Sequence, residues 1–187
     1  KREKIRMRAI LNKLSRSLPE EYIKRSNHGI RENLLTLDSW KQARSVFIYV
    51  SGNREPDTKA IILIALEEGK TVAVPRCLDD RAMEARIITT PDELRPGRYG
   101  ILEPDGNGIV LHPQSVDLVV APCIAADRQG YRLGHGGGYY DRYLLRVDCA
   151  TVCLCRARLL QDGVPHDAHD QPVDLVITED ECIGGVE

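Results

Sequence analysis

Residues 127–145 read DRQGYRLGHGGGYYDRYLL, and this stretch decides how the rest of the chain is interpreted. A short apolar run at 116–122 precedes it, which is typical of a buried strand. After the glycines, apolar side chains recur at helical spacing as far as Val147, which predicts a helix over 139–147. The stretch therefore joins a strand to a helix through a glycine-rich loop at 134–138.

The composition of this loop is that of an anion-binding site. Glycine permits positive φ angles and a close approach of a ligand to the backbone. The N–H groups that open a helix are unpaired and attract anions. Basic or potentially basic side chains and one carboxylate flank the loop: Arg128, Arg132, His135, Arg142 and Asp141. We therefore predict a cradle for a polyphosphate and Mg²⁺, with a plain glycine-rich turn as the alternative. The loop is neither a P-loop nor a dinucleotide fingerprint, because the glycine spacing differs and no Gly-Lys-Ser/Thr follows.

Composition limits the class of protein. The 187 residues are 42% hydrophobic and 29% charged, with a formal net charge of -2, which fits one globular domain over 1–187. This charge argues for neither nucleic acid nor a membrane as partner. No apolar run has membrane-spanning length and no secretory pattern is present, so a cytoplasmic location is expected. Six cysteines without a Cys-x-x-Cys pair indicate buried free thiols more than a zinc site.

A strand, a helix and a second strand are expected at 45–50, 58–66 and 71–75, and this βαβ unit predicts a parallel sheet. Further strands are expected at 83–88, 150–155 and 173–177. Residues 1–37 are expected to be helical, with a break at Pro19 and an apolar stripe made by Ile5, Ala9, Ile10 and Leu14. The predicted fold class is α/β, a mainly parallel sheet flanked by helices in three layers, with a basic N-terminal helical segment.

The segment 132–144 resembles the signature of the 5-formyltetrahydrofolate cyclo-ligase family, also called methenyltetrahydrofolate synthetases. Weaker motifs occur in the family's order: Lys4 and Arg8 as a Lys-x-x-x-Arg pair, Glu55 after the first strand, and a Gly-Ile-x-Glu-Pro segment at 100–104. The resemblance extends from Lys4 to about residue 178. It implies an ATP- and Mg²⁺-dependent enzyme that cyclises 5-formyltetrahydrofolate to 5,10-methenyltetrahydrofolate and releases ADP and phosphate.

The resemblance also implies roles for particular residues. ATP would be bound by Lys4, Arg8, Arg132, Leu133, Gly134, His135, Gly136, Gly137, Gly138, Tyr139 and Tyr140. The folate would be bound by Val50, Glu55, His135, Gly136, Gly137, Gly138 and Tyr139. Asp141 and Asp170 would share Mg²⁺, which prefers one or two carboxylates together with phosphates and water. No protein nucleophile is expected. His166 and His169 lie near Asp170 but do not match a zinc signature.

Four positions depart from the family pattern: Ala85, Ala126, Arg156 and Leu159. The family usually has aromatic residues at the first three and a glutamine at the fourth. A non-catalytic or substrate-shifted nucleotide-binding paralogue is therefore the alternative, and a sugar-phosphate isomerase-like enzyme is a weaker third. The expected partners are the small molecules ATP and 5-formyltetrahydrofolate, and the chain is expected to be a monomer or a homodimer.

Overall fold

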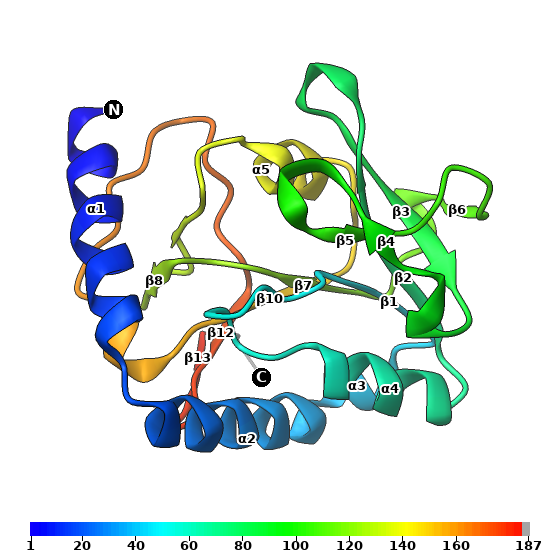
Figure 1. Ribbon diagram of the computed structural model, residues 1–187, viewed down its shortest axis with the longest axis horizontal. Helices are drawn as coiled ribbons and strands as arrows, with labels where there is room; N and C mark the ends of the chain where they lie inside the picture. The colour runs from blue at the N-terminus through cyan, green and yellow to red at the C-terminus, as the bar shows by residue number, and fades with distance from the viewer. Residues whose placement is uncertain (185–187) are drawn as a thin grey trace.

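The computed structural model describes residues 1–184, in which helices and strands are arranged around one large sheet (Figure 1). The helices are α1 (Arg2–Ser17), α2 (Glu20–Thr36), α3 (Asp38–Gln42), α4 (Lys59–Glu67) and α5 (Tyr139–Leu144). The strands are β1 (Ser45–Ile48), β2 (Thr71–Cys77), β3 (Met83–Ile88), β4 (Arg95–Pro96), β5 (Leu102–Glu103), β6 (Val110–Leu111), β7 (Leu118–Ala121), β8 (Ala125–Asp127), β9 (Arg132–Leu133), β10 (Ala150–Leu154), β11 (Leu160–Gln161), β12 (Leu175–Ile177) and β13 (Cys182–Gly184).

The large sheet has the strand order β13-β12-β10-β7-β1-β2-β3-β6. The central strands β12, β10, β7, β1 and β2 are parallel, with Phe47 of β1 opposite Val119 of β7 and Ala73 of β2. The outer strands pair in antiparallel fashion with their neighbours: β3 with β2, β6 with β3, and β13 with β12. The predicted mainly parallel sheet is therefore confirmed, as is the βαβ unit formed by β1, α4 and β2.

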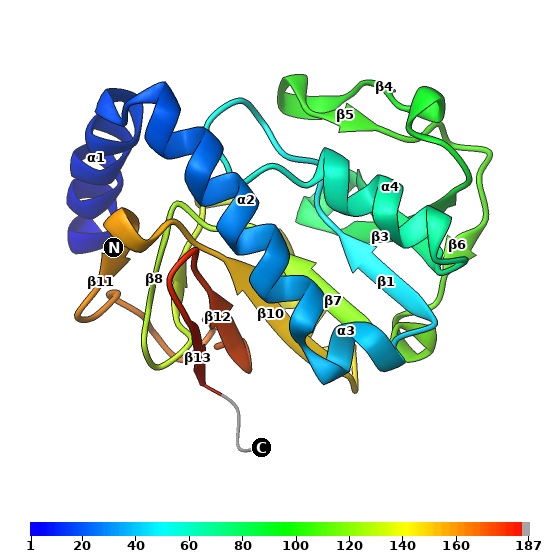
Figure 2. The same ribbon diagram turned by 90° about the horizontal axis from the view of Figure 1, so that it is seen from below.

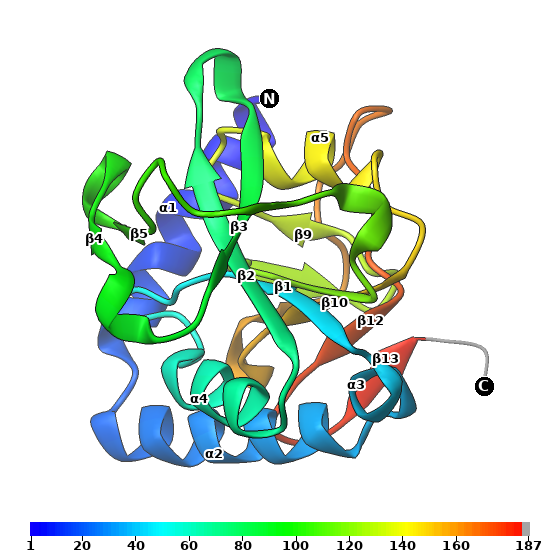
Figure 3. The same ribbon diagram turned by 90° about the vertical axis from the view of Figure 1, so that its right-hand side faces the viewer.

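The central strands are apolar on both faces, because helices or loops cover each face. Val46 and Ile48 of β1 pack in one cluster with α2, α3 and α4, whereas Phe47 packs in another with α5 and α1. Figure 2 shows α2, α3 and α4 crossing one face of the sheet, and Figure 3 shows α5 and β9 on the opposite side. The expected three layers are thus present.

The connections after β1 and β7 leave the sheet in opposite directions. β1 continues through α4 to β2 on one side, whereas β7 continues through β8, β9 and α5 to β10 on the other. Such a switch point opens a crevice outside the carboxyl ends of the strands, which is where ligands bind in open α/β sheets.

Two expectations about helices were wrong. The helix after the glycine loop ends at Leu144 rather than at 147, because the chain must turn there to enter β10; Arg146 N–H donates to the Tyr143 carbonyl in that turn at 2.9 Å. The apolar stripe expected on α1 faces solvent, since Ile5 and Ile10 are both 56% exposed.

The inward face of α1 consists instead of Lys4, Arg8, Leu11 and Ser15, spaced at helical intervals. Its polar members face the region that holds the glycine loop, and Leu11 anchors the helix to the core. Within residues 1–184, no helix is both long and apolar enough to cross a membrane.

Candidate active site

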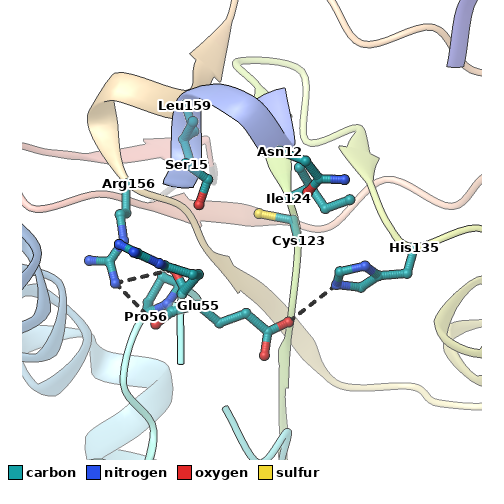
Figure 4. A pocket seen from close by; sticks show the side chains of 10 residues that line it. Asn12, Ser15, Glu55, Pro56, Cys123, Ile124, His135, Arg156 and Leu159 are labelled. Atoms are coloured by element: carbon teal, nitrogen blue, oxygen red, sulfur yellow. Dashed lines mark hydrogen bonds and ion pairs between the residues drawn. The ribbon is translucent and has the colours of Figure 1, made fainter. Parts of the chain in front are cut away.

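A small pocket lies at the carboxyl ends of β1, β7 and β10, at the switch point of the sheet (Figure 4). Its volume is about 60 Å³. Its walls come from the loops after these strands, from α1 and from the glycine loop: Asn12, Ser15, Arg54, Glu55, Pro56, Cys123, Ile124, His135, Arg156 and Leu159. Tertiary structure therefore brings together segments that lie far apart in the sequence.

Glu55 and His135 face each other across this pocket (Figure 4). Glu55 Oε1 lies 3.6 Å from His135 Nε2, which makes an ion pair when the imidazole is protonated. The other carboxylate oxygen, Oε2, accepts a hydrogen bond from Gly52 N–H at 2.8 Å. The two residues come from the loop after β1 and from the glycine loop, so they join the two segments for which substrate contacts were predicted.

The glycine loop carries arginine side chains on its carbonyl groups. Arg8 Nε donates to the Gly134 carbonyl at 2.6 Å, and Arg142 Nη1 donates to the Gly137 and Gly138 carbonyls at 3.1 and 3.0 Å. Gly136 has φ +100°, a conformation that side-chain-bearing residues rarely adopt. Within the described part of the chain, no backbone N–H of 134–138 donates a hydrogen bond. The loop thus offers free backbone N–H donors beside the guanidinium groups of Arg8 and Arg142.

Asp141, at the start of α5, is tied to two other segments. Its Oδ1 accepts from Arg132 Nη2 at 3.1 Å and from Gln171 N–H at 3.2 Å. The Arg132 side chain is only 4% exposed, so Asp141 supplies the counterion for a buried guanidinium. Because Gln171 follows Asp170 directly, these bonds also bring the second predicted metal ligand close to Asp141.

Asp170 is bound by Lys4 of α1. Lys4 Nζ donates to Asp170 Oδ2 and, at 3.1 Å, to Asp167 Oδ2. Burial alone would lower the pKa of the Lys4 ammonium, but the two carboxylates outweigh it and the pKa is raised. The same hydrogen bond from Lys4 lowers the pKa of Asp167. A residue predicted to bind ATP and one predicted to bind Mg²⁺ are therefore in direct contact.

Other predicted site residues have side chains that pack in the core rather than in the pocket. The side chains of Val50 and Leu133 are buried in the core at 4% and 1% exposure. The Tyr140 ring stacks on Phe47 at 6.1 Å between ring centroids, and burial raises the pKa of its hydroxyl well above the ordinary value. Any ligand contact of Val50 and Leu133 would thus involve their backbone. Tyr139 is partly buried against the core, and its hydroxyl lies 3.3 Å from that of Tyr99, which places the 100–104 segment near the site.

Arg128 does not join the cations around the loop, because it pairs with Glu181 at 2.5 Å. The His166 ring stacks on Tyr131 with 3.5 Å between ring centroids, and its Nδ1 lies 3.0 Å from the Val164 carbonyl. Within residues 1–184, no three side chains of His, Cys, Asp or Glu are clustered to hold a metal ion. All six cysteines are free thiols, and Cys123, Cys153 and Cys155 are buried.

Sequence reasoning missed several residues of the pocket wall. Asn12, Ser15, Cys123 and Ile124 were not singled out, because α1 and the segment after β7 carry no motif at these positions. Of the four departures from the family pattern, Ala85 and Ala126 lie in the core at 1% and 0% exposure. Only Arg156 and Leu159 line the pocket.

The fold and the site are those of an α/β enzyme with cations gathered around a glycine loop at a switch point of the sheet. Residues 1–179 match the family model for the 5-formyltetrahydrofolate cyclo-ligase family. The chain therefore belongs to this family of ligases, as the resemblance implied.

Individual relatives agree with this assignment. The chain is 28% identical to a probable 5-formyltetrahydrofolate cyclo-ligase of Schizosaccharomyces pombe, over 98% of each chain. It is 30% identical to the 5-formyltetrahydrofolate cyclo-ligase of Mycolicibacterium smegmatis, over 95% of this chain and 94% of the relative. The solved structure of Aquifex aeolicus 5,10-methenyltetrahydrofolate synthetase superposes with a TM-score of 0.86 at 31% identity, covering 97% of this chain and 92% of that one.

Proposed function

We propose that this enzyme cyclises 5-formyltetrahydrofolate to 5,10-methenyltetrahydrofolate with consumption of ATP in the presence of Mg²⁺. The observation that carries the proposal is the convergence of Lys4, Arg8 and Arg132 with the glycine loop, beside the pocket that Glu55 and His135 share. The cations and the free loop N–H groups suit the phosphates of ATP, and the Glu55 carboxylate in the pocket suits the N–H groups of the folate ring that must react with them.

Two carboxylates fit Mg²⁺ in their chemistry. Asp141 and Asp170 each use one oxygen in the hydrogen bonds described above, and within residues 1–184 no protein group bonds to Asp141 Oδ2 or Asp170 Oδ1. Mg²⁺ typically takes one or two protein carboxylates and completes its shell with phosphates and water. When bound, the ion neutralises phosphate charge and orients the γ-phosphoryl group. Lys4 would then transfer from Asp170 towards the nucleotide.

The proposed reaction needs positioning and charge neutralisation more than a protein nucleophile. The formyl oxygen attacks the γ-phosphorus, and ADP leaves. N10 then attacks the activated formyl carbon, the carbon–oxygen bond breaks, and phosphate leaves while N10 loses its proton. Arg8, Arg132 and the loop N–H groups would hold the phosphates. The Glu55 carboxylate would accept hydrogen bonds from the N–H and amino groups of the pterin. Val50 and Leu133 would contact the ligands through their backbone, and Tyr140 would support the site through its packing on Phe47.

The test is near-ultraviolet absorbance with purified protein, 5-formyltetrahydrofolate, MgCl₂ and ATP, because the conjugated methenyl product absorbs where the substrate does not. We expect a signal that requires both ATP and Mg²⁺. A flat trace from folded protein that binds ATP would contradict the proposal. It would favour the second candidate, a substrate-shifted or non-catalytic paralogue, for which Arg156 and Leu159 in the pocket wall are the supporting observation.

The remaining proposals concern the whole chain. We propose one domain over 1–187, a monomer or homodimer, and a cytoplasmic location. The free thiols support a reducing compartment. Size-exclusion chromatography with light scattering measures the oligomeric state.

A further inference from the structure

Arg156 follows β10 and is buried beside the pocket, with 1% of its surface exposed. Its guanidinium bonds to the loop after β1 (Figure 4) and also to α2. Nη2 donates to the Glu55 carbonyl at 3.0 Å and to the Arg54 carbonyl at 3.4 Å. Nη1 donates to Ser26 Oγ and, at 3.4 Å, to the Ile23 carbonyl, both in α2. Arg156 therefore fastens the loop after β1 to α2.

This cation is not part of an ion pair. Within residues 1–184, no carboxylate lies within ion-pair distance of its guanidinium, and its Nε has no partner. Burial lowers the pKa of the Arg156 side chain, yet an arginine remains charged in proteins. The Glu179 carboxylate, beyond ion-pair distance, partly offsets the effect of burial. A buried charge without a directly paired counterion is costly, and apolar side chains often fill such places with equal or better stability. Core packing therefore does not explain an arginine here, whereas the four acceptor groups in two segments do.

The acceptors in the loop determine how Glu55 is held. The Arg54 and Glu55 carbonyls belong to the two peptide groups on either side of the Glu55 Cα, so bonds to both restrict the backbone that directs its side chain. The next carbonyl, of Pro56, accepts from the Tyr49 hydroxyl at 2.9 Å. With its backbone fixed in this way, Glu55 directs its carboxylate toward His135 across the pocket.

We propose that Arg156 is a positioning residue that holds Glu55 ready for the formylated folate. The proposal rests on the proposed function, because it assigns Arg156 to the substrate that Glu55 would bind. A lysine at 156 keeps the positive charge but has one ammonium group in place of a planar fork, so it cannot bridge α2 and the loop in the same way.

The kinetic test compares Arg156→Lys with Arg158→Lys. Arg158 is two residues away and exposed, with its guanidinium over the Tyr22 ring, so it is a matched control. We expect Arg156→Lys to raise the KM for 5-formyltetrahydrofolate about tenfold and to leave the KM for ATP within about twofold, because bonds from a charged donor to the Glu55 loop are lost. Arg158→Lys should change neither constant. Equal changes in both KM values, or none in a folded variant, would overturn the proposal.

A coupling test asks whether Arg156 acts through Glu55. In a Glu55→Gln background, the further effect of Arg156→Lys on the folate KM should fall to within about twofold, since residues that act together are not additive. Additive effects would show that Arg156 acts independently of Glu55. Ser26→Ala leaves the arginine in place and removes one anchor in α2, so it should raise the same KM by a smaller factor, about threefold. This variant tests the proposal even if Arg156→Lys does not fold.

Hydrogen exchange separates this proposal from the proposed function. The amides of 51–58 should exchange about tenfold faster in Arg156→Lys or Ser26→Ala than in wild type, and those of 130–140 should not change. If wild-type protein makes no methenyl product but the exchange result holds, the proposed function fails and the role of Arg156 in holding the loop stands. Unchanged exchange in folded variants would overturn that role whatever the activity.

Discussion

Individual charged residues at this site serve two partners each. Asp141 neutralises the buried Arg132 and also accepts from Gln171, which fixes the 165–172 segment against α5. Lys4 bridges Asp167 and Asp170. Pairing lowers the cost of placing the buried Arg132 and the partly buried Lys4 in the protein. Under the proposed function, phosphates and Mg²⁺ would replace these internal partners.

Asp141→Asn tests this arrangement at a single atom. The amide keeps the shape of the side chain but removes the charge that pairs with Arg132 and that the proposed Mg²⁺ would need, so we expect kcat/KM to fall by a factor of about 100 or more. Thermal stability should fall slightly, since Arg132 loses its counterion. Steady-state kinetics and a thermal melt measure the two effects. Asp162→Asn, at an exposed position outside the site, is the control. Wild-type turnover in Asp141→Asn would refute the metal assignment.

Among the elements, α1 shows the largest difference between sequence pattern and structure. Its apolar pattern did not reveal how much it contributes to the site. Its inward face carries Lys4, Arg8 and the pocket residues Asn12 and Ser15, while Ile5, Ile10 and Leu14 face outward. A helix that bordered only the core would place its apolar face inward. This helix borders the glycine loop, the 167–170 segment and the pocket along most of its length, so polar side chains face inward, and Leu11 and Met7 pack it against the core.

The orientation of α1 predicts unequal effects of two similar mutations. Leu11→Ala should lower the free energy of unfolding by about 2–4 kcal/mol, because Leu11 is 3% exposed and its removal leaves a cavity. Ile10→Ala, at a position 56% exposed, should change it by no more than about 0.5 kcal/mol. Urea denaturation followed by circular dichroism measures both. A larger loss for Ile10→Ala would mean that α1 packs with the face first expected from the sequence.

At the scale of the whole molecule, the free energy of unfolding should fall as the pH becomes alkaline. Burial raises the pKa of the Cys77 and Cys149 thiols from 9.0 to about 11, and that of the Tyr22 and Tyr143 hydroxyls from 10.0 to about 12. Between the unfolded and folded pKa values the folded state binds more protons than the unfolded state. The free energy of unfolding must therefore fall as pH rises through this range.

We expect the free energy of unfolding to be unaffected by these four groups below pH 9 and to decrease progressively from about pH 9 to pH 12. Urea denaturation at a series of pH values measures it. Tyr143→Phe removes one of the buried hydroxyls, which has no hydrogen-bond partner in the described residues, and should make the decrease less steep. Stability that stayed constant or rose over this range would contradict the assignment of these groups as wholly or partly buried and neutral.

Local sequence patterns were sufficient for most elements of the fold. Interactions among neighbouring residues account for the apolar strands at 45–48 and 118–121. They also account for the end of α4 just before Gly69 and for the break between helices at Pro19. The family could also be identified, because the motif at 132–144 is contiguous and specific. The pairing of Arg8 with the glycine loop joins two parts of the chain whose motifs could be seen but whose contact could not.

The sequence by itself determined the α/β class, the parallel sheet, the family and the positions of its motifs, since all of these depend on periodicity or on contiguous residues. Only the tertiary structure decided which face of α1 is inward, that Lys4 contacts Asp170, and that Arg156 donates to the Glu55 carbonyl. These contacts join residues more than a hundred positions apart. They depend on how the switch point brings strand ends and helices together, and no local pattern records that arrangement.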